Sequence, residues 1–182
     1  MAYGVLIESM IQAKNIDALN RSVKAEIDVD GGNLIALTAP TEQGNDVWTA
    51  SAPTTGKLGN LWIAYNPCVK YTVVNGKKFA GLSADNRDYT NIKGEVFDAF
   101  KPVVGDEIIV TIDDVDATGA SAVEGDILES KNGQTKFTRV AGGTATSGST
   151  AFQIEWVGTV DFPKAGIGID KVKAFKAVCV QA

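Results

Sequence analysis

The chain has 182 residues, of which 45% are hydrophobic and 21% charged, and its net charge is −5. This composition is typical of one globular domain, or of one domain with a small appendage, and it excludes an intrinsically disordered chain. No apolar run approaches the ~20 residues that a membrane span needs, and a nucleic-acid coat would carry a basic face. We therefore expect neither membrane nor nucleic acid as a partner.

Short runs of alternating apolar and polar residues are the main signal along the chain. Residues 23–29 place Val and Ala on one face and charged residues on the other, which predicts a half-buried strand. Asp30-Gly31-Gly32-Asn33 follows, and glycines at this spacing favour a tight hairpin turn. Residues 34–38 are then predicted to form the returning strand.

Two further strands are predicted at residues 62–65 and 69–74. Asn75-Gly76 follows the second, and this dipeptide is typical of a two-residue hairpin turn. The sequence thus predicts a second hairpin around these two residues.

The C-terminal half continues in the same way. Strands are predicted at residues 107–113, at 126–129 and 135–140 around the turn Asn132-Gly133, and at 172–180, where a mixed apolar run favours a closing strand buried on both sides. Phe152, Ile154, Trp156 and Val160 share one face of another predicted strand. That spacing predicts a core position for Trp156.

Helix-like spacing is scarce. Residues 8–19 favour one amphipathic helix, and Ile92, Val96 and Phe100 favour a short one over residues 91–100, ending before Pro102. Residues 141–150, AGGTATSGST, have the composition of a loop. We predict a mainly β fold, a sandwich or barrel of short antiparallel strands with one to three short helices. Residues 1–182 form a single β-rich domain, with residues 1–60 as a candidate arm or subdomain.

The residues of common catalytic sites are missing. Without histidine there is no Ser-His-Asp or Cys-His arrangement, and two cysteines cannot complete an ordinary zinc site. Residues 114–119 begin like a calcium loop, but the twelfth position is Gly125 where a bidentate Glu is needed, which favours a solvated acidic turn. We therefore expect no enzyme, no metal and no cofactor.

Charge and cysteine placement leave two questions open. Residues 102–130 carry eight carboxylates and no Lys or Arg, whereas residues 65–101 lean basic. This asymmetry favours either simple solubility or a bipolar docking surface. Cys179 lies in an apolar run typical of a buried free thiol, and a Cys68–Cys179 bridge is the alternative.

Trp48 is the best candidate for an exposed partner contact. It lies between polar residues near expected loops, unlike Trp156 on its core-like face. Trp48, Trp62 and Trp156 together could line a sugar or peptide groove.

Two segments carry a family resemblance. The first is Val123 to Gly133, where Gly125-Asp126 starts a strand and Asn132-Gly133 turns it back. It resembles a hairpin that recurs in small decoration proteins of tailed-bacteriophage capsids. The second runs from Asn75 to Asp106 and includes VFDAFKPVVGD. It is similar to proteins associated with the gene next to the major capsid protein in phages of Gram-positive hosts.

The resemblance implies a β-rich subunit on the outside of a capsid, often a trimer at threefold positions. We therefore expect a decoration or auxiliary head protein that binds the major capsid protein and stabilises the shell. It would be made in the host cytoplasm, since no secretion signal is visible, and would reside on the capsid surface of the virion. A ring-forming virion β-protein such as a tail tube is the alternative, and a carbohydrate-binding module acting through Trp48 is a third.

Overall fold

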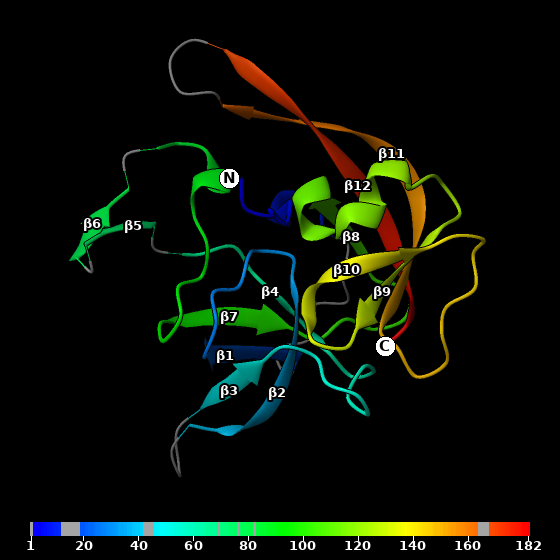
Figure 1. Ribbon diagram of the computed structural model, residues 1–182, viewed down its shortest axis with the longest axis horizontal. Coiled ribbons are helices and arrows are strands. Elements are labelled where there is room, and N and C mark those ends of the chain that lie inside the picture. The colour runs from blue at the N-terminus through cyan, green and yellow to red at the C-terminus, as the bar shows by residue number, and fades with distance from the viewer. Residues whose placement is uncertain are drawn as a thin grey trace.

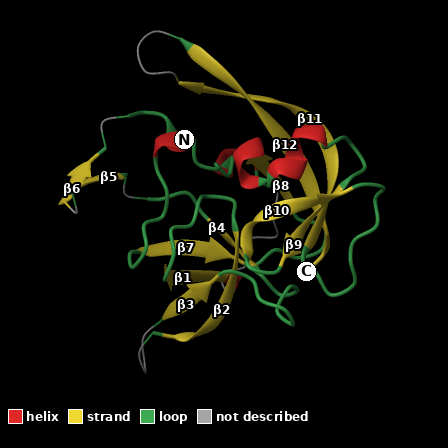
Figure 2. Cartoon of the chain, viewed as in Figure 1, coloured by secondary structure: helices red, strands yellow, loops and turns green. Residues whose placement is uncertain are grey.

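The computed structural model describes residues 2–11, 19–41, 46–68, 70–75, 77–81, 83–163 and 168–182, and within them the fold is mainly β (Figures 1 and 2). The short 3₁₀ helices are η1 (Glu8–Met10), η3 (Asn86–Asp88), η4 (Ile112–Asp114) and η5 (Ala117–Ser121). The strands are β1 (Asn20–Ala25), β2 (Leu34–Pro40), β3 (Val47–Ser51), β4 (Trp62–Ala64), β5 (Tyr71–Val74), β6 (Lys77–Ala80), β7 (Val96–Phe100), β8 (Glu107–Thr111), β9 (Ile127–Lys131), β10 (Gln134–Val140), β11 (Ala151–Pro163) and β12 (Ile169–Gln181).

Five strands form a closed barrel in the order β1-β3-β2-β4-β7. The β1–β3 pair is parallel and the other four pairs are antiparallel. Because side chains alternate along a strand, each strand contributes one inward row. The inward row is small and apolar, and its buried members are Val23, Ala25, Ile35, Ala50, Ala64, Phe97 and Ala99.

A second, five-stranded sheet has the order β10-β9-β11-β12-β8. Its centre is the long β11–β12 hairpin, whose strands have 13 residues each. The hairpin is flanked by β9 on the β11 side and by β8 on the β12 side. Figure 1 shows this sheet beside the barrel, with the outer end of the hairpin extending past the rest of the sheet.

One hydrophobic core joins the two parts. The outward row of the barrel, including Leu34, Ile63 and Phe100, belongs to the same buried cluster as Phe152 and Phe175 of the sheet. Residues 20–51, within the candidate arm 1–60, form three of the five barrel strands.

Two turns of the same kind start β8 and β9. Gly105-Asp106 and Gly125-Asp126 each place the glycine at positive φ, 97° and 88°, where a side chain would be strained. Each aspartate then accepts a hydrogen bond from the backbone amide three residues earlier, Val103 at 2.8 Å and Val123 at 3.0 Å. The Gly-Asp pattern in the sequence is thus a repeated way of starting a strand.

Both turns attach to the central hairpin in the same way. The Gly105 amide donates to the Cys179 carbonyl, and the Cys179 amide donates to the Asp106 carbonyl, both at 2.8 Å. At the second turn, the Gly125 amide donates to the Ile154 carbonyl on β11, and the Ile154 amide donates to the Asp126 carbonyl, again at 2.8 Å each. The turns thus extend the sheet by one bonded pair on each side.

Asp126 is the more heavily bonded of the two aspartates. Its carboxylate accepts from Arg139 at 2.6 Å and from the Gly142 amide at 3.3 Å, besides Val123. Burial alone would raise the pKa of Asp126, but these three donors lower it below its usual value. The charged form is therefore favoured in the folded protein.

Asp126→Asn is expected to lose about 1–3 kcal/mol of stability at about pH 7. Because the folded pKa lies below the unfolded value of about 3.9, the stabilisation is present above that value and is lost as pH falls through the folded pKa. Urea unfolding at about pH 7 and about pH 3 should show the gap to wild type shrinking in acid. Glu124→Gln, at an exposed neighbour, is the matched control. A gap that stays constant with pH would contradict this role.

Asp114 is fully buried where three segments of the chain meet. Its Oδ2 accepts from the Val5 amide at 3.1 Å and from the Thr111 amide and hydroxyl at 3.0 Å each, and its Oδ1 accepts from Asn33 Nδ2 at 3.1 Å. Gly4 makes room for the carboxylate, because a Cβ there would lie 1.9 Å from Oδ1. Burial raises the pKa of Asp114 well above its usual range, against the hydrogen bonds from Thr111.

The structure corrects the predicted hairpin at Asp30 to Asn33. β1 and β2 do not pair with each other, since β3 lies between them in the barrel. The two glycines serve close approach instead: a Cβ on Gly31 would lie 1.9 Å from Asn66 Oδ1, and Gly32 lies against Asp114. A glycine can allow either a tight turn or the close approach of another group to the backbone, and the sequence alone does not distinguish these two roles.

The predicted helix over residues 91–100 is also wrong. Residues 96–100 form strand β7, which pairs with both β1 and β4 and closes the barrel. The spacing of Ile92, Val96 and Phe100 is coincidental, because the buried rows of β7 follow period two. Of the predicted helix over residues 8–19, η1 covers Glu8–Met10, and residues 12–18 lie outside the described residues.

Other predictions are confirmed. The pairs Val74↔Lys77 and Gln134↔Lys131 place two-residue turns at 75–76 and 132–133, although Gly76 itself lies outside the described residues. Residues 141–150 contain no strand. Both cysteines are free, Cys68 exposed and Cys179 buried. The mainly β fold class is confirmed as well.

Candidate functional site

One end of the barrel is lined by the last inward side chain of each strand. Arg21 precedes Val23 on the inward row of β1, and Trp48 pairs with Val23 across the parallel β1–β3 ladder. Lys101 follows Ala99 on the row of β7, and Trp62 starts β4 at the same level. The registers therefore bring these side chains to the same end, which we call the barrel mouth.

The barrel mouth is a hollow of about 240 Å³ lined by Arg21, Leu37, Trp48, Asn60, Trp62 and Lys101. A second hollow of about 450 Å³ shares Arg21 and Trp48 with it and is also lined by Asn20, Ser22 and Asp46. Mouths of β-barrels are common places for ligand pockets, and such pockets are typically ~300–1,000 Å³. The second hollow lies within this range, and the barrel mouth adjoins it.

Hydrogen-bond donors dominate the barrel mouth. The Arg21 guanidinium lies over the Trp62 ring, 5.9 Å from its centroid, and donates one bond to the Asn20 carbonyl at 2.9 Å. Among the described residues, neither Arg21 nor Lys101 has a carboxylate partner. The indole N–H groups of Trp48 and Trp62 also have no acceptor within that part of the chain. The mouth therefore offers two cations and two N–H donors.

The sequence identified only part of this site. Trp48, the predicted partner contact, lies in the barrel mouth and is half-buried against the barrel core. Trp62 was named with Trp48 and Trp156 as a candidate groove lining, and of these three only Trp48 and Trp62 line the barrel mouth. Arg21 and Lys101 were not singled out, because their convergence depends on the register of four strand pairs. The sequence contains only a weak indication that Arg21 belongs to the inward row: it lies two residues before Val23, as Val23 lies two residues before Ala25.

A second exposed feature is the outer part of the β11–β12 hairpin. β11 pairs with β9 only at residues 151–153, and β12 pairs with β8 only at 174–178. Residues 159–163 and 169–173, which we call the ribbon, pair only with each other within the described chain. Exposed strand edges are ready to pair with or pack against another chain.

The ribbon has one covered face and one open face. Phe162 and Val172 form a small buried cluster with Val5, which covers the inner side. Arg87 braces the same region, since it bonds Asp170 at 2.8 Å and lies over the Phe162 ring. On the open face Ile169 is 67% exposed, the highest value among the large hydrophobic side chains described.

The prediction that Trp156 lies in the core is wrong. It is 39% exposed, because the register shifts between Ile154 and Trp156 and Glu155 is the extra residue of a β-bulge. Past the bulge the indole ring lies over Gly158, where a Cβ would be 1.8 Å from the ring. The bulge thus moves this side chain from the core to the surface.

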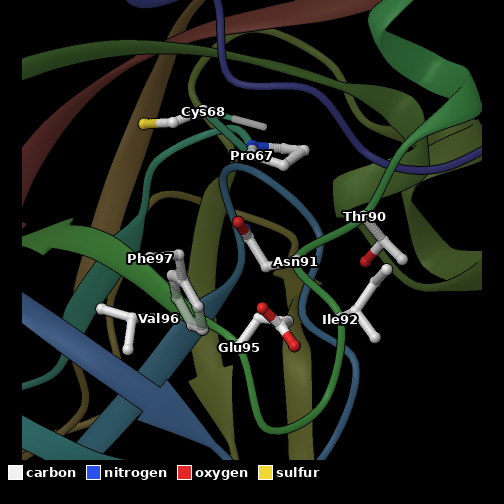
Figure 3. Close-up of a pocket in the computed structure, with 8 residues that line it drawn as sticks. All are labelled: Pro67, Cys68, Thr90, Asn91, Ile92, Glu95, Val96 and Phe97. Atoms are coloured by element: carbon white, nitrogen blue, oxygen red, sulfur yellow. The ribbon is translucent and has the colours of Figure 1, made fainter. Parts of the chain in front are cut away.

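A smaller hollow of about 130 Å³ lies at the start of β7 (Figure 3). Asn91 lies at its centre in Figure 3, with Thr90 and Ile92 on one side and Phe97 on the other. Asn91 is 3% exposed; its Nδ2 donates to the Tyr65 carbonyl at 2.9 Å, and its Oδ1 has no partner in the described chain. The volume is below that of ordinary ligand pockets.

The acidic segment 102–130 is used largely inside the fold, and not as a charged surface. Asp106, Asp114 and Asp126 are buried and hydrogen-bonded. Glu129 holds the 141–150 loop through Thr146, whose amide and hydroxyl both donate to it at 2.8 Å. Most of the carboxylates on which the predicted bipolar surface depends are therefore hydrogen-bonded or ion-paired within the fold.

The reactive groups in the described chain are arranged for structure. Asp116 caps η5 by accepting from the Thr118 amide at 2.9 Å, and with Asp114 facing inward the predicted acidic turn forms no metal cluster in that part of the chain. Burial raises the pKa of the Cys179 thiol to about 11, so it is not a nucleophile at neutral pH.

Searches against family models, curated proteins and solved structures found no match to this chain. No helix among the described residues is long and apolar enough to span a bilayer.

Proposed function

We propose that this chain is a structural protein of a bacteriophage virion that binds the outside of the capsid and stabilises the shell. Its partner would be the major capsid protein, and it would act as a homo-oligomer, with a trimer favoured. The proposal assigns it no catalysis. It rests on the resemblance of residues 75–106 and 123–133 to capsid-associated proteins, and on one structural feature.

The observation that carries the proposal is the ribbon. Strands β11 and β12 have 13 residues each, much longer than the usual five or six. Among the described residues, their outer parts pair only with each other. The ribbon also exposes apolar surface at Ile169 while Arg87 and Val5 hold its inner face against the body near its outer end. A braced arm with open edges and an apolar side chain suits contact with another protein.

The Gly-Asp turns support the same role. They lie in the two segments that carry the resemblance, and each starts a strand and attaches it to the β11–β12 hairpin. The base of the ribbon is therefore held in a bonded sheet on both sides. A rigid arm loses little entropy on binding, which favours affinity.

Shell stabilisation would follow from mass action. A protein that binds the assembled shell and not its separated subunits stabilises the shell by RT ln(1 + [L]/Kd) per site. Capsid symmetry repeats the site many times, and an oligomer that holds several capsomers gains avidity.

The test is co-sedimentation of the purified protein with preformed shells of the major capsid protein from the same phage, followed by a thermal melt of the shells. We expect saturable binding at micromolar protein and a higher shell melting temperature. If the protein stays in the supernatant, or binds without shifting the melt, the stabilising role is wrong. Polymerisation of the purified chain into rings or tubes would favour the tail-tube alternative instead.

A further inference from the structure

The walls of the barrel mouth suit a flat ligand with an apolar face. Trp48 and Trp62 both pack on the barrel core while remaining partly exposed, and Leu37 lies between their strands. Indole rings offer large, rigid apolar faces at low entropy cost. A pyranose ring has an apolar C–H face of similar breadth.

The edges of the same hollow suit an anion. Arg21 and Lys101 have no carboxylate partner among the described residues, although the whole chain carries a net charge of −5. A guanidinium matches a carboxylate through two parallel hydrogen bonds. The unpaired indole N–H groups add donors and no acceptors. A ligand carboxylate could therefore pair with both cations without displacing an ion pair among the described residues.

The adjoining hollow suits sugar hydroxyls. The Ser22 hydroxyl donates to Asp98 at 2.9 Å, which leaves its lone pairs as acceptors. Asp46 supplies further acceptors at the exposed start of β3. The second hollow therefore adds acceptors to the one side-chain amide, Asn60, that lines the barrel mouth.

Two other ligand classes fit less well. A peptide commonly binds β-proteins by adding a strand to a free edge, and the closed barrel offers no such edge here. A nucleic acid needs an extended row of cations, whereas carboxylates of Asp46 and Asp98 lie near Arg21. A single carboxylate on a sugar ring avoids both difficulties.

We propose that the barrel mouth binds a carboxylate-bearing sugar residue of a polysaccharide. Arg21 and Lys101 take the carboxylate, Trp48 and Trp62 take the ring face, and the adjoining hollow takes the next sugar. This site is independent of the ribbon, so it goes beyond shell binding. It would give a capsid-bound protein a second, outward attachment to anionic glycans.

The test is calorimetric titration of the full chain, without shells, with a tetrasaccharide of alternating glucuronate and N-acetylglucosamine. The matched ligand is its carboxyl-reduced form, which differs only in lacking charge. We expect binding of the acidic sugar with a change in tryptophan fluorescence, and at least about tenfold weaker binding of the reduced form. Equal binding of the two, or no binding of either, would overturn the proposal.

Variants separate the site from the fold. Arg21→Gln is expected to weaken acidic-sugar binding at least about tenfold, because it removes the charge-assisted bonds at a partly exposed position. Trp48→Ala should also weaken it, and Arg21→Gln keeps the test decisive if Trp48→Ala fails to fold. Trp156→Ala is the matched control, because that indole lies on the β11–β12 hairpin, and it should bind as wild type does. Tighter binding of tetraglutamate than of the sugar would show a peptide site and refute ours.

Discussion

Asp114→Asn is expected to lower the free energy of unfolding by about 3 kcal/mol, the largest loss we predict for an isosteric change. Oδ2 accepts three donors from Val5 and Thr111, so an amide NH₂ in its place would face three N–H or O–H groups. Rotating the amide places the NH₂ against Asn33 Nδ2 instead. A compensating rotation of Asn33 would also require the Thr135 hydroxyl, which donates to Asn33 Oδ1 at 2.8 Å, to turn and accept instead.

Thermal unfolding should show a fall in Tm of roughly 6–12 °C for Asp114→Asn, given ~2–4 °C per kcal/mol for a chain of this size. Asp113→Asn is the matched control. Asp113 is half-buried and has no hydrogen-bond partner among the described residues, so a change within about 0.5 kcal/mol is expected. Equal effects of the two changes would mean that the buried hydrogen bonds around Asp114 do not hold the three segments together.

Ile169→Asp is expected to weaken shell binding at least about 30-fold, which corresponds to ~2 kcal/mol for an interface anchor. Ile169 is the most exposed large hydrophobic side chain described and lies at the outer end of the ribbon. Burying a carboxylate against the shell adds a desolvation cost to the lost apolar contact. The measurement is co-sedimentation over a range of protein concentrations.

Val96→Asp is the control for charge and hydrophobicity. Val96 is 57% exposed, starts β7 in the barrel and is not part of the ribbon. Its variant should bind shells as wild type does, and both variants should melt as wild type does because neither side chain is buried. A similar loss for both would show that added negative charge, and not the ribbon, weakens binding.

Local turn chemistry was read correctly at residues 132–133 but wrongly at residues 30–33. Asn132-Gly133 forms its two-residue turn, and Gly133 takes the positive φ of 75° that favours glycine. Asp30-Gly31-Gly32-Asn33 has similar composition but makes no hairpin, because its glycines allow Asn66 and Asp114 to approach the backbone. The difference lies in residues more than 30 positions away, which no local pattern contains.

Errors in side-chain placement have equally specific causes. A single bulged residue, Glu155, moves Trp156 out of the core, since one extra residue reverses the faces of a strand. The helix over residues 91–100 failed because residues four apart share one face of a strand as well as one stripe of a helix. Tertiary pairing with β1 and β4 decides between the two.

The candidate sites lie beyond local inference for the same reason. Trp48 could be singled out as an aromatic residue near loops, but its neighbours in the barrel mouth come from β1, β4 and the end of β7. The ribbon depends on how far β9 and β8 extend along the hairpin. Strand lengths and registers are set by the whole fold.

The most direct test of the central claim is electron cryomicroscopy of phage shells mixed with the purified protein. The account predicts added density on the outer surface at symmetry-related positions, with the ribbon against the shell and the barrel mouth facing away from it. Bare shells at saturating protein, or density for this chain only within the tail, would contradict it.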